Sequence, residues 1–275
     1  MSITGYGNAS IFGNGTITFM VAFPSIIVST PPILRLDASG ASNFSFSSSN
    51  NIQTWKDLMG NYNFTSVGGN GTTNAPFATW NSTLNAVQFS LNKSFATNGY
   101  AGTDQATMLY NALPFTTPIP LTAGGTFYCV LQTNNGSTWY NGPFEFSSNT
   151  GYGNLYGYAD AKTLYIDTLA TTSSGAITIT PPNGGQNFYN KAIYKVTVTT
   201  ENIYTYHFIT SINNVSATWS GGARGISIPM VLGYGGTSEY NSFEGYIYEI
   251  LLYDTLLSSG DQSTVETYLI NKWSL

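Results

Sequence analysis

The stretch that most constrains this chain lies near its C-terminal end, in residues 243–273. Residues 246–253 are aromatic, β-branched or leucine at almost every position, and Glu249 is the only charge among them. A strand that is apolar on both faces is typical of the middle of a β-sandwich. These residues therefore predict a buried central strand.

The residues after this strand predict a short amphipathic helix. Ser258 is a good N-cap residue, and Asp261 follows three positions later, which is close to a capping box. Apolar residues then recur at spacings of three and four, which predicts one buried helix face made of Val265, Tyr268, Leu269 and Trp273. A buried strand followed by one such helix predicts a closing element that docks on a sandwich built by the rest of the chain.

The remaining sequence alternates short apolar runs with polar turns at spacings of roughly ten residues, a pattern of antiparallel sandwiches. The run from Tyr194 to Thr199 alternates cleanly and predicts Tyr194, Val196 and Val198 as inward residues. Residues 43–50 and 61–78 are rich in Ser, Asn and Gly and are predicted to be loops. The fold class predicted is all-β, an antiparallel jelly-roll β-sandwich with a short C-terminal helix.

The first 32 residues differ from the rest and predict an N-terminal arm of two strands, at residues 16–23 and 25–29, that ends at Pro31 and Pro32. Two strands alone are marginal in water. The arm is therefore expected either to form an edge of the main sandwich or to exchange with another subunit. The predicted domains are the arm, residues 1–32, and the sandwich, residues 33–275. Met1 to Asn8 has no basic or long apolar region, so no secretory signal is expected.

Two groups of residues near the ends of the sandwich form a recognisable pattern. The C-terminal group comprises Phe243, Gly245, Ile247, Glu249, Ile250, Tyr253, Asp254, Leu257, Ser258, Tyr268, Leu269, Lys272 and Trp273. The earlier group comprises Leu36-Asp37-Ala38-Ser39 and Trp55-Lys56-Asp57. The pattern resembles that of the concanavalin A-like lectin/laminin G-like jelly-roll domain family. The resemblance implies the fold, whereas function stays open because this fold hosts lectins, adhesion modules, glycanases and virion proteins.

The low charge and the presence of only one cysteine and one histidine argue against several function classes. Only 8% of residues are charged, against about 25% in ordinary domains. The net charge of −5 argues against nucleic-acid binding, which needs a basic surface. Cys129 is the single cysteine and is expected to be a buried strand residue, and His207 is the single histidine. A zinc site or a Ser-His-Asp triad is therefore not expected.

Two kinds of ligand site are predicted from residue chemistry. Tyrosine and tryptophan faces with asparagine amides suit glycan binding, and the loops offer Trp139, Tyr140, Asn141, Tyr234 and Tyr240. Calcium takes carboxylate oxygens, and the resemblance makes Asp37 and Asp57 weak candidates. Their positions favour a structural role instead, as buried acids that cap turns or pair with backbone N–H groups.

Three functions remain open from the sequence. The first is a non-catalytic structural or surface protein of a virion, such as a minor capsid, vertex or fibre-head component, which assembles as a homo- or hetero-oligomer with other virion proteins. The second is a free-standing carbohydrate-binding module that is extracellular or at a cell surface. The third is a glycoside hydrolase, which would need two nearby carboxyl groups. The acids here are few and scattered, so no enzyme is expected, and no apolar run is long enough to span a membrane.

Overall fold

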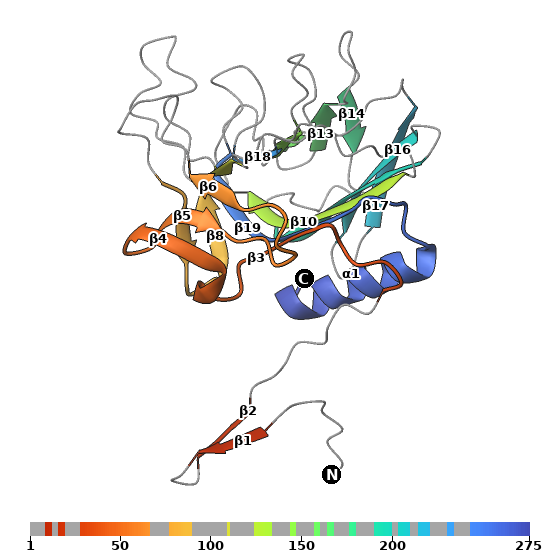
Figure 1. The fold of residues 1–275 in the computed structure, drawn as a ribbon. Coiled ribbons are helices and arrows are strands. Elements are labelled where there is room, and N and C mark those ends of the chain that lie inside the picture. The colour runs from red at the N-terminus through yellow and green to blue at the C-terminus, as the bar shows by residue number, and fades with distance from the viewer. Residues whose placement is uncertain are drawn as a thin grey trace, which may run out of the picture.

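The computed structural model places the chain as an antiparallel β-sandwich closed by one helix (Figure 1). The residues it describes are 9–12, 16–19, 28–66, 77–89, 109–110, 124–133, 144–146, 157–159, 164–167, 176–179, 190–199, 203–209, 214–220, 230–233 and 243–275. Every strand pairing among these residues is antiparallel, which confirms the predicted all-β sandwich class.

One sheet of 14 strands carries most of the structure. The first strands along the chain are β3 (Leu34–Asp37), β4 (Phe44–Ser48), β5 (Asn51–Trp55), β6 (Phe64–Ser66), β7 (Thr79–Asn81), β8 (Ala86–Phe89) and β9 (Leu109–Tyr110). The later ones are β10 (Gly125–Thr133), β11 (Phe144–Phe146), β15 (Ala192–Val198), β16 (Ile203–Ile209), β17 (Asn214–Ser220), β18 (Met230–Leu232) and β19 (Gly245–Tyr253). Their order is β11-β18-β9-β6-β5-β7-β8-β19-β10-β15-β16-β17, with β3 on β19 and β4 on β5.

The strand predicted to be central is β19, and it lies between β8 and β10 in the middle of the large sheet. It pairs with β10 along nearly its whole length, with β8 at its start and with β3 towards its end. Eight of its nine residues are buried, which explains why the sequence is apolar on both faces. The register with β10 shifts between Val130 and Leu131, a β-bulge that lies beside Glu249.

Two apolar clusters lie on the two faces of this sheet. The inner cluster fills the sandwich and includes Trp55, Phe127, Cys129, Ile250 and Phe243. It also contains Tyr194, Val196 and Val198, so the predicted inward face is confirmed. Cys129 is fully buried, as predicted.

The outer cluster lies between the sheet and the helix α1 (Ser259–Trp273). Its strand residues include Tyr128, Val130, Ile193 and Leu251. The helix contributes Val265, Tyr268, Leu269 and Trp273, the four residues predicted to form its buried face. Ser258 is the N-cap and accepts a hydrogen bond from the Asp261 backbone N–H, also as predicted. In Figure 1 α1 runs along the sheet face formed by β10 and β19.

A smaller sheet lies beside the main one. It consists of β12 (Gly157–Ala159), β13 (Leu164–Asp167) and β14 (Ala176–Ile179), in that order. β14 contacts β17, the last strand of the large sheet. Within the described part of the chain, no helix has the length and apolar character that a membrane span requires.

The two predicted loops both contain a strand. β4 lies within residues 43–50 because Phe44 and Phe46 alternate with serines, and their rings pack near Trp55 and Trp80. β6 lies within residues 61–78, where Phe64 is fully buried and pairs with Trp55. The loop predictions are wrong at these residues because the small polar residues obscured a period-two aromatic pattern.

The N-terminal arm contains a hairpin of two strands, of which β2 (Thr16–Phe19) lies within the predicted strand 16–23, whereas its partner β1 (Ala9–Phe12) precedes it and was not predicted. β1 pairs with β2, and among the described residues this two-stranded sheet pairs with no other strand. Residues 28–30 form no strand, and residues 20–27 lie outside the described part. The last part of the arm contacts the helix, since the Ser29 hydroxyl donates to the Asp261 carboxylate at 2.7 Å.

Candidate functional site

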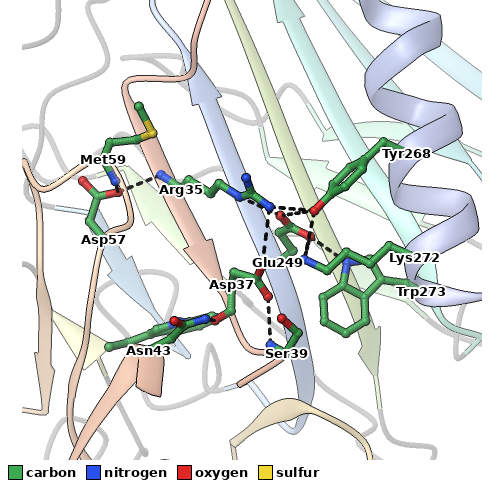
Figure 2. Close-up of polar contacts among 11 residues, drawn as sticks. Arg35, Asp37, Ser39, Asn43, Asp57, Met59, Glu249, Tyr268, Lys272 and Trp273 are labelled. Carbon is green, nitrogen blue, oxygen red and sulfur yellow. Dashed lines mark hydrogen bonds and ion pairs between the residues drawn. The ribbon is translucent and has the colours of Figure 1, made fainter. Parts of the chain in front are cut away.

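Five of the residues quoted for the resemblance meet in one buried cluster of charges around Glu249 (Figure 2): Asp37, Glu249, Tyr268, Lys272 and Trp273. Glu249 points from β19 towards α1, and its side chain is fully buried. One carboxylate oxygen accepts hydrogen bonds from Lys272 Nζ at 2.8 Å and Trp273 Nε1 at 2.9 Å. The other accepts from Arg35 Nε at 3.1 Å and from the Tyr268 hydroxyl at 3.3 Å. We call these residues, together with Asp37, the Glu249 network.

Asp37 completes the network from the neighbouring strand β3. Its carboxylate lies 2.5 Å from Lys272 Nζ and 3.5 Å from the Arg35 guanidinium. The other carboxylate oxygen accepts the Ser39 backbone N–H at 2.8 Å. Its main-chain carbonyl accepts Trp55 Nε1 at 3.2 Å. Asp37 therefore ties the start of the sandwich to the end of the helix.

Asp57 serves a separate structural purpose, visible at the edge of Figure 2. Its carboxylate accepts backbone N–H groups from Arg35, Met59, Asn61 and Tyr62, at 2.8 to 3.0 Å. The turn after β5 is thus wrapped around one buried acid. The structural reading of Asp37 and Asp57 agrees with these contacts. Among the described residues no group of three His, Cys, Asp or Glu side chains is placed to hold a metal ion.

The pKa values of the two acids of the network shift in opposite directions. Burial raises the pKa of Glu249, and the nearby Asp37 charge adds to that effect against the opposing Lys272 and Arg35 cations. For Asp37, burial also favours the neutral form, but the Lys272 ammonium and the hydrogen bonds from Lys272 and Ser39 outweigh it. The pKa of Asp37 is therefore lowered.

This arrangement suits holding the helix on the sheet better than catalysis. A Tyr–Glu pair beside an arginine could in principle supply a nucleophile, but Tyr268 is 6% exposed and Glu249 1%. Both groups already bond to each other and to cations inside the protein. Removing any one of the four charged members, Arg35, Asp37, Glu249 or Lys272, would leave the opposite charges with one fewer partner.

A second set of contacts holds the other end of α1. Lys195 on β15 donates to Glu266 at 2.7 Å and to Gln262 at 3.1 Å. The Thr126 hydroxyl accepts the Leu257 backbone N–H at 3.0 Å, just before the helix begins. The helix is therefore fixed by polar contacts at both ends and by apolar packing between them.

The five predicted glycan-binding residues, Trp139, Tyr140, Asn141, Tyr234 and Tyr240, lie outside the described residues. The strand ends that flank their two segments are described and lie together. Thr133 and Phe144 flank the first segment, and Gly233 and Phe243 flank the second. Thr133 pairs with Gly245, Phe144 pairs with Leu232, and the Phe243 N–H donates to the Gly233 carbonyl at 2.9 Å. The first segment is therefore flanked by the end of β10 and the start of β11, and the second by the end of β18 and the start of β19, which are their paired neighbours.

Arg35 is the network member that sequence reasoning missed. It lies between Leu34 and Leu36, two fully buried residues, and it reaches Glu249 across 214 positions of sequence. A charge inside an apolar strand was the only signal available, and Glu249 shows the same signal. Opposite charges in two apolar runs could have been paired on that ground.

Comparison with known proteins supports the fold. No protein-family model and no curated protein matches the chain. A crystal structure described as HCR/D-Sa-GBL1/C is 11% identical, with a TM-score of 0.52 over 86% of this chain and 52% of that one. The receptor-binding domain of botulinum neurotoxin type G is 12% identical, with a TM-score of 0.49 over 88% and 52%. A Trypanosoma rangeli sialidase bound to the inhibitor DANA is 10% identical, with a TM-score of 0.47 over 84% and 32%.

The chain spans only about a third to a half of these proteins. At 11% identity, the likeness to the structure with the TM-score of 0.52 is one of fold alone. The concanavalin A-like/laminin G-like resemblance stays a prediction from the sequence.

Proposed function

We propose that this chain is a non-catalytic surface protein that binds glycans with the segments 134–143 and 234–242 of a lectin-like sandwich. The observation that carries the proposal is the shared anchoring of the two segments on neighbouring strand ends. Segment 134–143 carries Trp139, Tyr140 and Asn141 and segment 234–242 carries Tyr234 and Tyr240, residue types suited to sugar rings and hydroxyl groups. Because their bases adjoin, both segments can reach one ligand.

The carboxylates support a binding rather than a hydrolytic function. Asp37 and Glu249 are bonded inside the network, and Asp57 is surrounded by backbone N–H groups. A glycosidase needs an acid and a second carboxylate open to the sugar. Of the described acids, the most buried ones have structural partners. A hydrolase would have to use other acids.

The setting we propose is the surface of a virion, with an extracellular or cell-surface location as the alternative. Only 8% of the residues in the chain are charged, and a surface made largely of Asn, Ser, Thr and Tyr suits packing against neighbouring proteins. The hairpin of β1 and β2, which pairs with no other described strand, supports an assembly role for the arm.

A glycan array tests the binding function directly. We expect the full chain to bind a defined set of glycans, and the double substitution Tyr140→Ala with Tyr234→Ala to abolish that binding. Phe77→Ala is the matched control, because Phe77 is an exposed aromatic residue outside both segments. Binding that survives the double substitution, or no binding to any glycan, would reject the proposed function.

Light scattering tests the assembly role separately. We expect the full chain to form an oligomer and a chain that starts at Ile33 to be a monomer with an unchanged thermal unfolding midpoint. Equal masses for both chains would remove the support for an assembly arm. The glycan-binding proposal would then remain, as a free-standing module.

A further inference from the structure

Six side chains form one row across the sheet, from β15 to β5. Tyr246 on β19 pairs with Gln132 on β10 and with Gln88 on β8. The row continues from Gln88 to Thr79 on β7 and then to Asn51 on β5. At its other end is Lys191, which precedes Ala192, the partner of Leu131, and so lies opposite Gln132. Residues directly opposite each other in antiparallel strands share one face of the sheet. We call this the outer-face row.

The row lies on the face of the sheet that α1 covers further along. Val130, Ile193 and Tyr248, each two positions from a row residue on its strand, belong to the cluster under α1. Leu131 and Ile247, one position away, belong to the interior of the sandwich. Since side chains alternate along a strand, the row faces outward.

The row lies beyond the last turn of the helix. Trp273, the last helical residue, packs against Tyr248 with ring centroids 5.4 Å apart, and Tyr248 is followed on its own face by Tyr246. All six residues of the row are half-buried, whereas their neighbours under the helix are buried. The row is therefore a part of the outer face that solvent still reaches.

The groups in the row are held in place by contacts at one end. The Tyr248 hydroxyl donates to Gln132 Oε1 at 3.0 Å, which fixes the amide and directs its donor NH2 group to another partner. The Lys191 ammonium lies 4.9 Å from the centre of the Tyr248 ring, and burial lowers the pKa of Lys191. No ion pair joins Lys191 to the described carboxylates, whereas Arg35, Lys195 and Lys272 are all paired.

We propose that the outer-face row binds an extended oligosaccharide laid across the strands, with an acidic group of the sugar chain at Lys191. Three amides, a hydroxyl and a tyrosine supply donors, acceptors and one aromatic ring, the groups that sugars use. Neighbouring strands are about 4.8 Å apart, so six strands present the row over about 24 Å. A regular polar repeat of that length fits a linear chain better than a compact ligand.

The inference rests on the proposed glycan-binding function and extends it. The pair next to Gln132 and Tyr246 is Thr133 and Gly245, the base of segment 134–143. An oligosaccharide in the row would therefore approach the proposed binding segments from the side of the helix.

Calorimetry with a length series of hyaluronan oligosaccharides, from disaccharide to octasaccharide, tests the row. We expect affinity to rise along the series, and Gln132→Ala and Gln88→Ala each to weaken binding about tenfold through a lost hydrogen bond. Lys191→Met should remove the preference over neutral cello-oligosaccharides of the same length. Gln88→Ala is the safer variant, because no hydrogen bond joins its side chain to other described residues.

Gln53→Ala is the control, since Gln53 is an exposed amide on β5 outside the row. Unchanged thermal unfolding would show that each variant is folded. The inference is overturned if the row variants bind like the parent chain, or if affinity does not depend on length. If Tyr140→Ala with Tyr234→Ala abolishes binding and the row variants do not weaken it, the proposed function stands without the row. If only the row variants weaken binding, the row stands and the binding segments do not.

Discussion

The Lys272 ammonium lies 2.8 Å from the Glu249 carboxylate, and the two side chains are only 3% and 0% exposed. This pair joins the last turn of α1 to the central strand, and the same ammonium also reaches Asp37 on β3. The helix, the central strand and the first strand of the sandwich are thus joined at one point. The contacts around that point explain how these charged residues are accommodated in an apolar environment.

Replacing Lys272 with methionine should destabilise the protein strongly. Lys272→Met leaves Glu249 and Asp37 buried with one fewer cation, and breaking a buried pair in this way costs about 3–5 kcal/mol. Urea unfolding measures the loss. Lys56→Met is the control, because Lys56 is an exposed lysine whose ammonium donates to a backbone carbonyl. Similar losses for the two variants would contradict a dominant role for the buried pair.

The free energy of unfolding should decrease in acid because Asp37 becomes protonated. Its pKa in the folded protein is below the ordinary value of 3.8, so its contribution is fully present above that value and disappears as pH falls through the lowered pKa. Glu249 acts in the opposite sense, because its raised pKa gives a contribution that is lost as pH rises through it. The stability difference between the wild type and Asp37→Asn isolates the first effect.

Unfolding curves across the acid range give that difference. It should be largest at about pH 5 and shrink steadily below the ordinary pKa of an aspartate, about 3.9. A difference that stays constant down to the lowest pH at which the protein folds would show that Asp37 does not act through its charge.

The helix N-cap should make a smaller contribution. Ser258 Oγ accepts the Asp261 N–H at 3.1 Å, and Ser258→Ala removes that acceptor from the first turn. Loss of an N-cap costs about 1 kcal/mol. Ser259→Ala changes the exposed next residue and should have almost no effect in the same thermal unfolding assay. If Ser258→Ala leaves the thermal unfolding midpoint unchanged, other contacts hold the helix start. One such contact joins the Gln262 side chain to the Leu257 carbonyl at 2.8 Å.

The sequence was sufficient to predict those elements whose own residues show the pattern. Ser258, the helix face with Trp273, and the inward Tyr194 follow from local spacing, and the structure has each of them where predicted. Glu249 could be identified as an exceptional charge in an apolar strand. Periodicity gives the face on which a side chain lies, and these predictions needed nothing more.

The partners of Glu249 needed the order of the strands, which periodicity does not give. Arg35 meets Glu249 because β3 pairs with the second half of β19, a choice that depends on the packing of the whole sheet. The strand with Phe44 and Phe46 was missed for a related reason, since its apolar face is completed by Trp80 from another strand. Both the Arg35–Glu249 contact and strand β4 depend on packing between segments far apart in the sequence.

Gly245 on β19 should not accept a side chain. A Cβ at this position would lie 2.3 Å from the Gln132 carbonyl oxygen and 2.7 Å from the Phe243 ring. Backbone on one side and a buried ring on the other leave no room, so Gly245→Ala should move β19 away from β10 at the base of both proposed binding segments. Overpacking of this kind costs about 1–3 kcal/mol.

Gly260→Ala is the matched control, because the nearest atom to its added Cβ is 3.9 Å away and alanine favours the helix over glycine by about 1 kcal/mol. Urea unfolding should therefore rank the variants with Gly260→Ala at or above the wild type and Gly245→Ala well below it. Glycan binding should fall for Gly245→Ala even at temperatures where it is folded, because the strand ends that anchor the two segments have moved. A Gly245→Ala protein with normal stability and normal binding would show that the pairing of Thr133 with Gly245 does not position the proposed site.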